Sequence, residues 1–286
     1  MTDFPDTGIA ITTADQLSTA ALHAAMLEAF SDYVVPMRPT LAQFTAMLCQ
    51  RSFDPKLTSV ALENGGLIAL WLIGCRESTG YLISSGTLPG WRGKGLAQRL
   101  ASNSEALLKR AGVTSLQLEV ISTNAQAIRV YEKLGFQAIR DLQCYAWHGI
   151  PEAPRQAHAV TEQDWQAMKP AVSDFRDWRP SWQNADEAVA NLGDRLVSLT
   201  VETEGKIAGY AVVEPESGTL FQIAVHPEYR GKGIGSMLIA SAATRCAEVK
   251  LRLLNADAAD KGFAAFLERL GAKKSVLQFE MRKELG

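Results

Sequence analysis

The sequence predicts an α/β (α+β) protein built from two tandem copies of one domain. Stretches with helical and with strand periodicity alternate along the 286 residues. Four short blocks recur in the same order in the two halves, which indicates an internal duplication. Each half also contains a basic, glycine-rich turn that opens a long helical pattern, and these turns are Arg92-Gly93-Lys94-Gly95-Leu96-Ala97 and Arg230-Gly231-Lys232-Gly233-Ile234-Gly235.

The elements of the first half follow from their periodicity and their caps. Apolar residues at helical spacing predict a first helix that is capped by Thr13 or Asp15 and ends near Phe30. Asn64-Gly65-Gly66 separates two strand patterns and predicts a hairpin turn. Further helices are predicted at Leu41–Cys49, from Leu96 to a stop at Gly112, and from Asn124 to Leu134. Strands are predicted at Thr58–Glu63, Leu67–Ile73, Tyr81–Thr87, Ser115–Ile121 and Leu142–Trp147.

The second half repeats these elements. Phe175-Arg176-Asp177-Trp178 matches Phe30-Ser31-Asp32-Tyr33, and Phe266–Gly271 matches Val130–Gly135. The offset between matching blocks changes only from 145 to 136 residues along the chain. A segment with Gly149, Pro151 and Pro154 separates the halves and is typical of a linker. The sequence therefore predicts an N-terminal domain at residues 1–149 and a C-terminal domain at residues 156–286.

Composition and charge exclude several classes of function. The formal net charge is −2, so no overall basic field favours nucleic acid. The four cysteines and four histidines form no pattern with metal-ligand spacing, so we expect reduced thiols and no metal site. The N-terminal residues lack the pattern of a secretory signal, and no apolar run is long enough for a membrane span. We therefore expect a cytoplasmic protein without nucleic acid or membrane partners.

Each basic turn has the features of an anion site. A turn that opens a helix leaves several backbone N–H groups without intrahelical acceptors, at the positive end of the helix dipole. Glycine allows close approach and tolerates positive φ, so a phosphate or pyrophosphate suits the turn. A single copy is as compatible with a solvated basic turn, and neither copy fits the Walker pattern. The recurrence in matching contexts favours the anion site.

The residues around the turns resemble a known family. Leu88–Ala97 resembles motif A of the GNAT superfamily of acyl-CoA-dependent N-acetyltransferases, Asn124–Phe136 resembles its motif B, and Ala224–Gly235 is a second motif A. The resemblance covers both halves. It implies two tandem GNAT-like domains, each with a mixed, mostly antiparallel sheet that is flanked by helices and splays open between its fourth and fifth strands. It further implies that acetyl-CoA (CoA) lies in that opening, with the pyrophosphate on the turn.

Cofactor binding is carried over from the family residue by residue. In the first half the resemblance assigns it to Leu88, Arg92, Gly93, Lys94, Gly95, Leu96, Ala97, Asn124 and Tyr131. In the second half it assigns it to Val225, Arg230, Gly231, Lys232, Gly233, Ile234 and Gly235.

The family reaction is the attack of a neutral amine on a thioester, and it needs a proton donor near the departing thiolate. Tyr131 matches the motif B tyrosine that supplies this proton in many members, whereas Leu267 stands at its place in the second half. Asp260 likewise replaces Asn124, and an ionised carboxylate can only accept hydrogen bonds. Glu119 is the candidate general base, although a solvated or ion-paired carboxylate is an equal interpretation. We therefore expect the first domain to be catalytic and the second to be degenerate.

Other interpretations stay open. The C-terminal domain is the alternative catalytic copy, because some family members need no tyrosine and because Gly86 weakens the strand Tyr81–Thr87. A second alternative is a non-catalytic acyl-CoA-binding or regulatory module. Asp32 and Tyr33 lie where loops usually set specificity and are candidate ligands for a small-molecule amine, although Asp32 could equally cap a turn. A tandem pair is compatible with a monomer or a homodimer, and the acceptor itself cannot be derived from the motifs.

Overall fold

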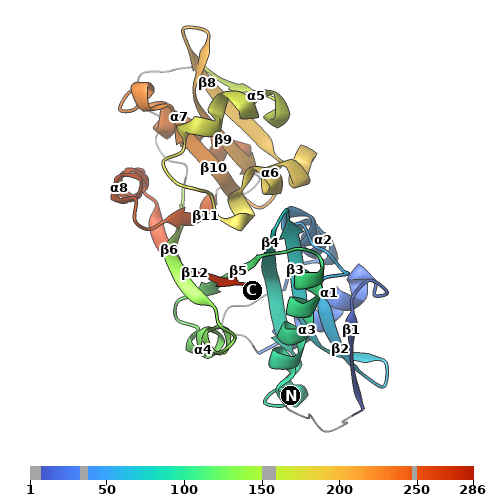
Figure 1. The fold of residues 1–286 in the computed structure, drawn as a ribbon. Coiled ribbons are helices and arrows are strands. Elements are labelled where there is room, and N and C mark those ends of the chain that lie inside the picture. The colour runs from blue at the N-terminus through green and yellow to red at the C-terminus, as the bar shows by residue number, and fades with distance from the viewer. Residues whose placement is uncertain (1–7, 33–37, 150–158, 247–249) are drawn as a thin grey trace. The chain divides into compact units, whose positions relative to one another are not determined.

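The computed structural model describes residues 8–32, 38–149, 159–246 and 250–286. The chain forms two compact units, which are described separately here. The first unit contains residues 1–120, 124–138 and 281–286, and the second contains residues 121–123 and 139–280. Figure 1 follows the elements along the chain.

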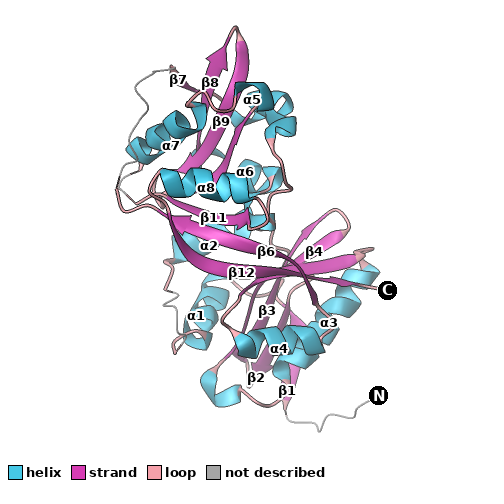
Figure 2. Ribbon diagram, turned by 90° about the vertical axis from the view of Figure 1, so that its left-hand side faces the viewer, coloured by secondary structure: helices cyan, strands magenta, loops and turns pink. Residues whose placement is uncertain are grey.

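The first unit is a mixed sheet with helices packed on it. Its helices are α1 (Thr19–Ala29), α2 (Leu41–Gln50), α3 (Leu96–Arg110) and α4 (Ala125–Lys133). Its strands are β1 (Ile9–Thr13), β2 (Ser59–Glu63), β3 (Gly66–Arg76), β4 (Thr79–Thr87) and β5 (Ser115–Ile121), in that spatial order. Neighbouring strands from β1 to β4 are antiparallel, and β5 is parallel to β4. Helices α1 and α3 pack against β3 (Figure 2) and bury Leu22, Met26, Leu100 and Leu108.

The second unit repeats this arrangement. Its helices are α5 (Trp165–Val172), α6 (Asp186–Leu192), α7 (Ile234–Arg245) and α8 (Lys261–Arg269). Its strands are β6 (Gln137–Ala146), β7 (Val160–Glu162), β8 (Val197–Thr203), β9 (Lys206–Glu214), β10 (Thr219–Val225), β11 (Arg252–Asp257) and β12 (Lys273–Glu284). The spatial order is β12-β6-β11-β10-β9-β8-β7, and β10 is parallel to β11. Mixed, mostly antiparallel strands with flanking helices in both units confirm the predicted fold class.

Most of β6 and the end of β12 belong to a different compact unit from the sequence repeat that precedes each of them. Strand β6 follows the first repeat in the sequence, yet Tyr145 and Trp147 pack in the core of the second unit, against α7 and β9 residues such as Leu238 and Ala211. The last residues of β12 belong to the first unit, where Leu285 donates a backbone hydrogen bond of 2.8 Å to Thr114. The compact units are thus a different division of the chain from the repeats seen in the sequence.

The first helix and the strand before it differ from the expectation. Helix α1 begins at Thr19, because Ser18 is its N-cap and accepts a hydrogen bond of 3.2 Å from the Ala21 N–H. Thr13, one of the two expected caps, instead ends β1, and its hydroxyl donates to Asp15. The expected cap at Thr13 or Asp15 is therefore wrong, and β1 was not predicted.

The predicted hairpin turn is confirmed. Glu63 pairs with Gly66, and the two residues between them, Asn64 and Gly65, both have positive φ, of 49° and 80°. This conformation matches the twist of the strands that it joins. Gly86 does not interrupt β4, since it pairs with Leu70. A Cβ at Gly86 would lie 2.8 Å from the Cβ of Ala29, so this glycine allows α1 to pack closely on the sheet.

Candidate functional site

Each sheet opens at the same place. Strands β4 and β5 pair only from Thr79 to Tyr81, and the corresponding strands β10 and β11 pair only at Thr219 and Leu220. A bulge in β4 follows directly, and β10 has one at the matching position. The expected splay between the fourth and fifth strands is confirmed in both units. The later part of β4 and of β10 therefore faces an opening in place of a neighbouring strand.

The glycine-rich turn of the first unit lies at the end of this opening. Gly93 and Gly95 have φ values of 76° and 74°, which side chains with a Cβ rarely adopt. A Cβ at Gly93 would meet no atom within 4 Å, so the turn presents open backbone. Leu96 is buried and anchors the start of α3, whose first N–H groups have no intrahelical acceptors. Lys94 lies over the Trp91 ring, 4.1 Å from its centroid.

The arginine of this turn is engaged by the protein. Arg92 Nη1 and Nη2 donate to the two carboxylate oxygens of Asp32 at 2.6 and 2.7 Å. Arg92 also donates to the carbonyl oxygens of Thr87 and Ala29, at 3.2 and 3.0 Å. Hydrogen bonds from Arg92 lower the pKa of the Asp32 carboxyl. The predicted substrate residue Asp32 and the predicted cofactor residue Arg92 are thus paired with each other. Tyr33, the other predicted substrate residue, lies outside the described residues.

Tyr131 reaches the opening from α4. Its Oη lies 3.0 Å from the Ser85 Oγ, on the part of β4 that has left β5. Trp71 and Phe136 hold the ring edge-on, at centroid distances of 6.3 and 6.0 Å. A phenol keeps its proton at neutral pH, so this geometry places a proton donor at the point where the strands separate. The motif predicted Tyr131, but it did not predict its partner Ser85.

Glu119 lies on β5, two residues beyond Gln117, the last residue of β5 that pairs with β4. The hydroxyl of buried Tyr81 donates a hydrogen bond to Glu119 Oε2, and Tyr81 belongs to the last pair between β4 and β5. Asn124 is the N-cap of α4, and its Oδ1 accepts a hydrogen bond of 3.1 Å from the Ala127 N–H. The structure therefore connects Glu119 to β4 through Tyr81 and Tyr131 to β4 through Ser85, while Asn124 caps the helix that carries Tyr131.

The second unit has the same turn and the same arginine pair. Gly231 and Gly233 have φ values of 76° and 83°, and Lys232 lies over the Tyr229 ring at 5.0 Å from its centroid. Arg230 donates to Asp177 at 3.1 Å, and to the carbonyl oxygens of Val225 and Phe175 at 3.0 and 3.1 Å. Like Arg92, Arg230 is paired with an aspartate and donates to two backbone carbonyl oxygens, so the predicted cofactor residues Arg230 to Gly235 form a turn of similar construction.

A cavity of about 580 Å³ occupies the cleft of the second unit. It extends from the turn along the free part of β10 to a polar floor formed by Arg176, Gln222 and Asn184. Arg176 Nη1 donates to Asp186 at 2.5 Å and to Gln222 at 3.2 Å, and Gln222 accepts from the Tyr210 hydroxyl at 2.9 Å. Burial opposes ionisation of Asp186, but hydrogen bonds from Arg176 and Gln222 bring its pKa below the usual value. Burial also raises the pKa of Tyr210 to about 12.

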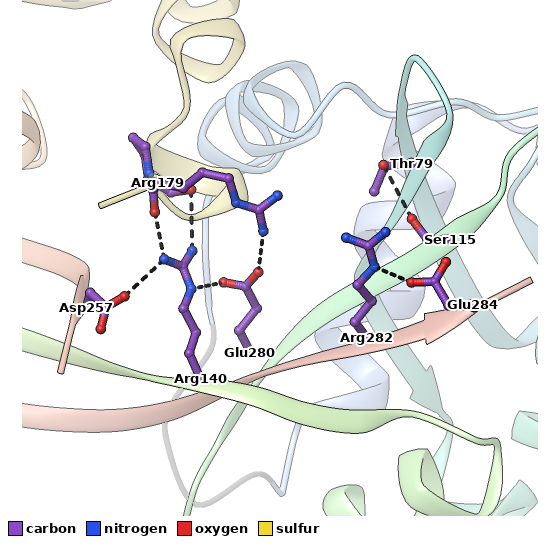
Figure 3. Close-up of polar contacts among 9 residues, drawn as sticks. Thr79, Ser115, Arg140, Arg179, Asp257, Glu280, Arg282 and Glu284 are labelled. Atoms are coloured by element: carbon purple, nitrogen blue, oxygen red, sulfur yellow. Dashed lines mark hydrogen bonds and ion pairs between the residues drawn. The ribbon is translucent and has the colours of Figure 1, made fainter. Parts of the chain in front are cut away.

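A second network of charges fixes the loop beside this cavity. Figure 3 shows Arg140 between Asp257 and Glu280, with Arg179 on the other carboxylate oxygen of Glu280. Glu280 is 0 % exposed, and Arg140 donates to it at 2.6 Å and to the Arg179 carbonyl oxygen at 2.7 Å. The loop after α5 is basic and aromatic, with Arg176, Trp178 and Arg179. In the structure its arginines Arg176 and Arg179 are already paired with carboxylates.

The residues that would carry the reaction differ in the second cleft. Leu267, at the place of Tyr131, is fully buried. Asp260 caps α8 by accepting a hydrogen bond of 2.9 Å from the Phe263 N–H, as Asn124 caps α4. Asn255 stands as far before Asp260 as Glu119 stands before Asn124, and it has a φ of 57° at an irregularity in β11. The second cleft therefore retains the turn and lacks both the phenol and the carboxylate.

Sequence reasoning missed the buried polar partners of the site. Ser85, Tyr81, Gln222 and Asp186 carry no motif, and only their neighbourhood in space reveals them. The four-residue match between Phe30–Tyr33 and Phe175–Trp178 did contain a signal, because it preserves the aspartate that pairs with the arginine of each turn. In the described part of the chain, no helix is long and apolar enough to cross a membrane. Those same residues include no group of three His, Cys, Asp or Glu side chains that could hold a metal ion.

The splayed sheet with a glycine-rich turn at the start of a helix is present in both units, as in an acyltransferase fold in tandem. The family model described as "Acetyltransferase (GNAT) family" matches residues 23–136 and again residues 158–272. The chain therefore belongs to the GNAT family of acetyltransferases.

Parts of this chain are similar in sequence to named proteins. A mycothiol acetyltransferase from Beutenbergia cavernae is 29% identical over 49% of this chain and 46% of its own length. A mycothiol acetyltransferase from Kineococcus radiotolerans is 34% identical over 46% of this chain and 42% of its own length. The chain thus spans less than half the length of these two relatives. An N-alpha-acetyltransferase 30 from Schizosaccharomyces pombe is 28% identical over 33% of this chain and 67% of its own length.

Solved structures share the tandem fold. A GCN5-related N-acetyltransferase from Sphaerobacter thermophilus superposes with a TM-score of 0.73 over 99% of this chain and 97% of its own, at 17% identity. A tandem GNAT protein from the clavulanic acid biosynthesis pathway gives a TM-score of 0.69 over 97% of this chain and 98% of its own, at 15% identity. At these identities the likeness shows the fold alone.

Proposed function

We propose that the first unit transfers an acetyl group from acetyl-CoA to the amine of a small-molecule acceptor, with Tyr131 as general acid. The observation that carries this proposal is the 3.0 Å contact between Tyr131 Oη and Ser85 Oγ across the opening of the sheet. It supports a phenol beside the free part of β4, the strand that leads to the glycine-rich turn. The second cleft has no phenol at the corresponding position, because Leu267 stands there.

The first cleft fits a CoA-type cofactor. Gly93 leaves open space at a helix N-terminus, which suits a pyrophosphate, and the later part of β4 offers strand edge to an amide-bearing arm. Gly93, Lys94, Gly95, Leu96 and Ala97 would hold the phosphates through backbone N–H groups, and Leu88 ends the strand that leads to them. When bound, acetyl-CoA would supply an activated acetyl thioester.

The side chains of this cleft would then divide the proton chemistry between them. Tyr131 holds a proton at Oη, where a leaving thiolate needs it. Glu119 is the candidate base for the acceptor amine, and Tyr81 orients its carboxylate. Asp32 fixes Arg92 at the turn, so it supports the acceptor side of the cleft rather than offering a free carboxylate. Tyr33 stays a candidate acceptor residue from the sequence alone.

One observation favours a second candidate function. The cavity of about 580 Å³ in the second unit includes the turn residues Arg230, Gly231, Gly233, Ile234 and Gly235. A cleft of this kind would bind an acyl-CoA, either as a second catalytic copy or as a non-catalytic module. The loss of the phenol and the carboxylate favours the module for this unit.

Calorimetric titration with acetyl-CoA on two turn variants tests the assignment. Asparagine tolerates positive φ and adds bulk where the phosphates would lie, so Gly93→Asn with Gly95→Asn blocks the first turn, and Gly231→Asn with Gly233→Asn blocks the second. CoA release is then measured with a panel of small amines that includes mycothiol-related ones. It is quantified by chromatography, because a thiol acceptor would itself react with a thiol reagent.

We expect the first variant to lose amine-dependent CoA release and the second variant to retain it. Loss of release only in the second variant would reverse the assignment and make Tyr131 an ordinary helix residue. Acetyl-CoA binding in the wild type without release for any amine above the hydrolysis background would favour the binding module.

A further inference from the structure

An aromatic wall lines the second cleft. It consists of Trp178, Phe263 and Phe266, which are half-buried and line the cavity. Trp178 meets Phe263 edge-on at a centroid distance of 6.0 Å, and Phe263 lies 6.1 Å from Phe266. Phe266 reaches the first turn of α7, because a Cβ at Gly235 would come within 2.8 Å of its ring. The wall therefore extends from the loop after α5 to the glycine-rich turn.

At three of the corresponding positions the first unit carries smaller or more polar residues. Helix α4 carries Ala127 and Val130 where α8 carries Phe263 and Phe266. On the splayed strand, Ile223 stands at the place of Ser85, since the bulges of β4 and β10 fix the alignment of the two strands. Each of these replacements adds apolar surface to the second cleft, and none adds a group that could take part in acyl transfer.

Two of the arginines that line this cavity are paired with carboxylates. Arg176 is paired with Asp186 at 2.5 Å, and Arg230 with Asp177 at 3.0 Å. The Arg140–Glu280 network holds the chain around Arg179 and Pro180, and Pro180 lines the cavity as Trp178 does. The aromatic wall is apolar and the loop that carries Trp178 is anchored, which suits a bulky apolar group.

We propose that the second cleft binds a CoA thioester whose acyl group is apolar and longer than acetyl, and that it holds this ligand without turnover. The inference rests on the proposed function, because it takes the turn at Arg230–Gly235 as a CoA site. The wall supplies the acyl-binding surface, and the turn supplies the phosphate site. Without a phenol at Leu267 and with Ile223 in place of Ser85, the thioester meets no proton donor from the positions that provide one in the first cleft.

The test uses the full chain with its first turn blocked by Gly93→Asn and Gly95→Asn. Acetyl-CoA and octanoyl-CoA are titrated by calorimetry. Burial of the longer chain against the wall should make octanoyl-CoA bind at least about tenfold more tightly than acetyl-CoA. Phe263→Ala, which introduces the residue type of the first cleft, should reduce this preference to about threefold or less. Ile139→Ala is the matched control, because Ile139 is an exposed apolar residue of the same unit outside the cavity, and it should leave the preference unchanged.

Equal affinity for the two thioesters would overturn the proposal, and so would a preference that survives Phe263→Ala. Amine-dependent CoA release from octanoyl-CoA by the blocked protein would contradict the absence of turnover. If Phe263→Ala fails to fold by circular dichroism, Trp178→Leu provides the second variant, and it should also weaken octanoyl-CoA binding.

The failure of this inference and the failure of the proposed function give different results. The activity of the first unit is measured separately, in the protein whose second turn carries Gly231→Asn and Gly233→Asn. If the protein with the blocked first turn binds neither thioester, while the protein with the blocked second turn still acetylates, only the inference is overturned. If the protein with the blocked second turn no longer acetylates, while the protein with the blocked first turn keeps its preference for octanoyl-CoA, only the proposed function is overturned.

Discussion

Arg92 and Asp32 form a two-pronged ion pair, with hydrogen bonds of 2.6 and 2.7 Å, between the glycine-rich turn and the end of α1. Arg230 and Asp177 form the same pair in the second unit, and in both the arginine also donates to two backbone carbonyl oxygens. Both pairs are largely exposed, so each contributes little to stability. The arginine therefore ties each turn to the segment around its aspartate, and under the proposed function the backbone N–H groups of the turn are left for the phosphates.

Arg92→Lys tests this tie. Lysine cannot reproduce a planar, two-pronged contact with a carboxylate, so the Asp32 side chain should lose its fixed position. We expect the KM for the acceptor to rise roughly three- to tenfold, a change of about 1 kcal/mol, with the Kd of acetyl-CoA nearly unchanged. The matched control is Arg282→Lys, which alters another exposed pair, Arg282–Glu284 at 2.7 Å (Figure 3). An equal rise in the Kd of acetyl-CoA would assign Arg92 to phosphate binding instead.

Tyr131→Phe tests the general acid. The change removes one hydroxyl and keeps the ring contacts with Trp71 and Phe136. We expect kcat to fall roughly 10²- to 10³-fold while the Kd of acetyl-CoA stays within about twofold, because general acid catalysis contributes on this scale. Tyr145→Phe, a buried tyrosine of β6, is the control and should leave kcat unchanged. A kcat within a few-fold of the wild type would exclude Tyr131 as the acid.

Local sequence predicted the elements and turns that depend on local chemistry. Asn64-Gly65 formed the expected hairpin because both residues accept positive φ, and the repeated glycines formed two matching turns for the same reason. Strand β1 was missed although Ile9–Thr13 alternates between half-buried and exposed residues, because its short pattern precedes the first helix without a turn signal. The cap of α1 was misplaced for a related reason, since Thr13, Asp15 and Ser18 are all good caps and only the position of β1 selects Ser18.

Local sequence could not predict to which compact unit β6 and the end of β12 belong. Tyr145 and Trp147 are apolar residues at the end of a strand pattern, and apolar character does not indicate which core will bury them. The same holds for Met281 and Leu285, which are buried at the other end of the chain. At the site, motif comparison placed Tyr131 and Glu119 in one cleft, but the partners Ser85 and Tyr81 depend on the bulge and splay of β4.

Gly235→Ala tests the fit between α7 and the aromatic wall. The new Cβ would lie 2.8 Å from the Phe266 ring, so the substitution should lower the free energy of unfolding by about 1 kcal/mol or more. In the Phe266→Val background the clash is gone, and the better helix propensity of alanine should then stabilise the protein by up to about 1 kcal/mol. Urea unfolding of the four proteins measures both effects. The same sign in both backgrounds would show that Phe266 and Gly235 do not constrain each other.

Asp186→Asn tests the ion pair under the cavity floor. Loss of the carboxylate leaves Arg176 largely buried without its charge partner, which should cost about 3 kcal/mol at pH 7. The folded pKa of Asp186 lies below its unfolded value, so the pair stabilises the fold above about pH 4 and this contribution disappears as the pH falls through the folded pKa. The wild type should therefore be more stable than the variant at neutral pH and approach it below about pH 4. A difference that is independent of pH between 3 and 7 would contradict the ion pair as its source.

Deletion of residues 281–286 tests whether the chain's last residues complete the first unit. Met281 and Leu285 are buried, Lys283 forms an ion pair with Glu105 of α3, and the Leu285 N–H bonds to Thr114 beside β5. Removal of the two apolar side chains alone should lower the unfolding free energy of this unit by about 3 kcal/mol. Since Tyr131 and Glu119 lie in that unit, acetylation should fall, whereas octanoyl-CoA binding through the second turn should persist. Met281→Ala with Leu285→Ala keeps the chain length and should reproduce most of the loss. Full acetylation and unchanged unfolding after the deletion would show that the first unit folds without this strand.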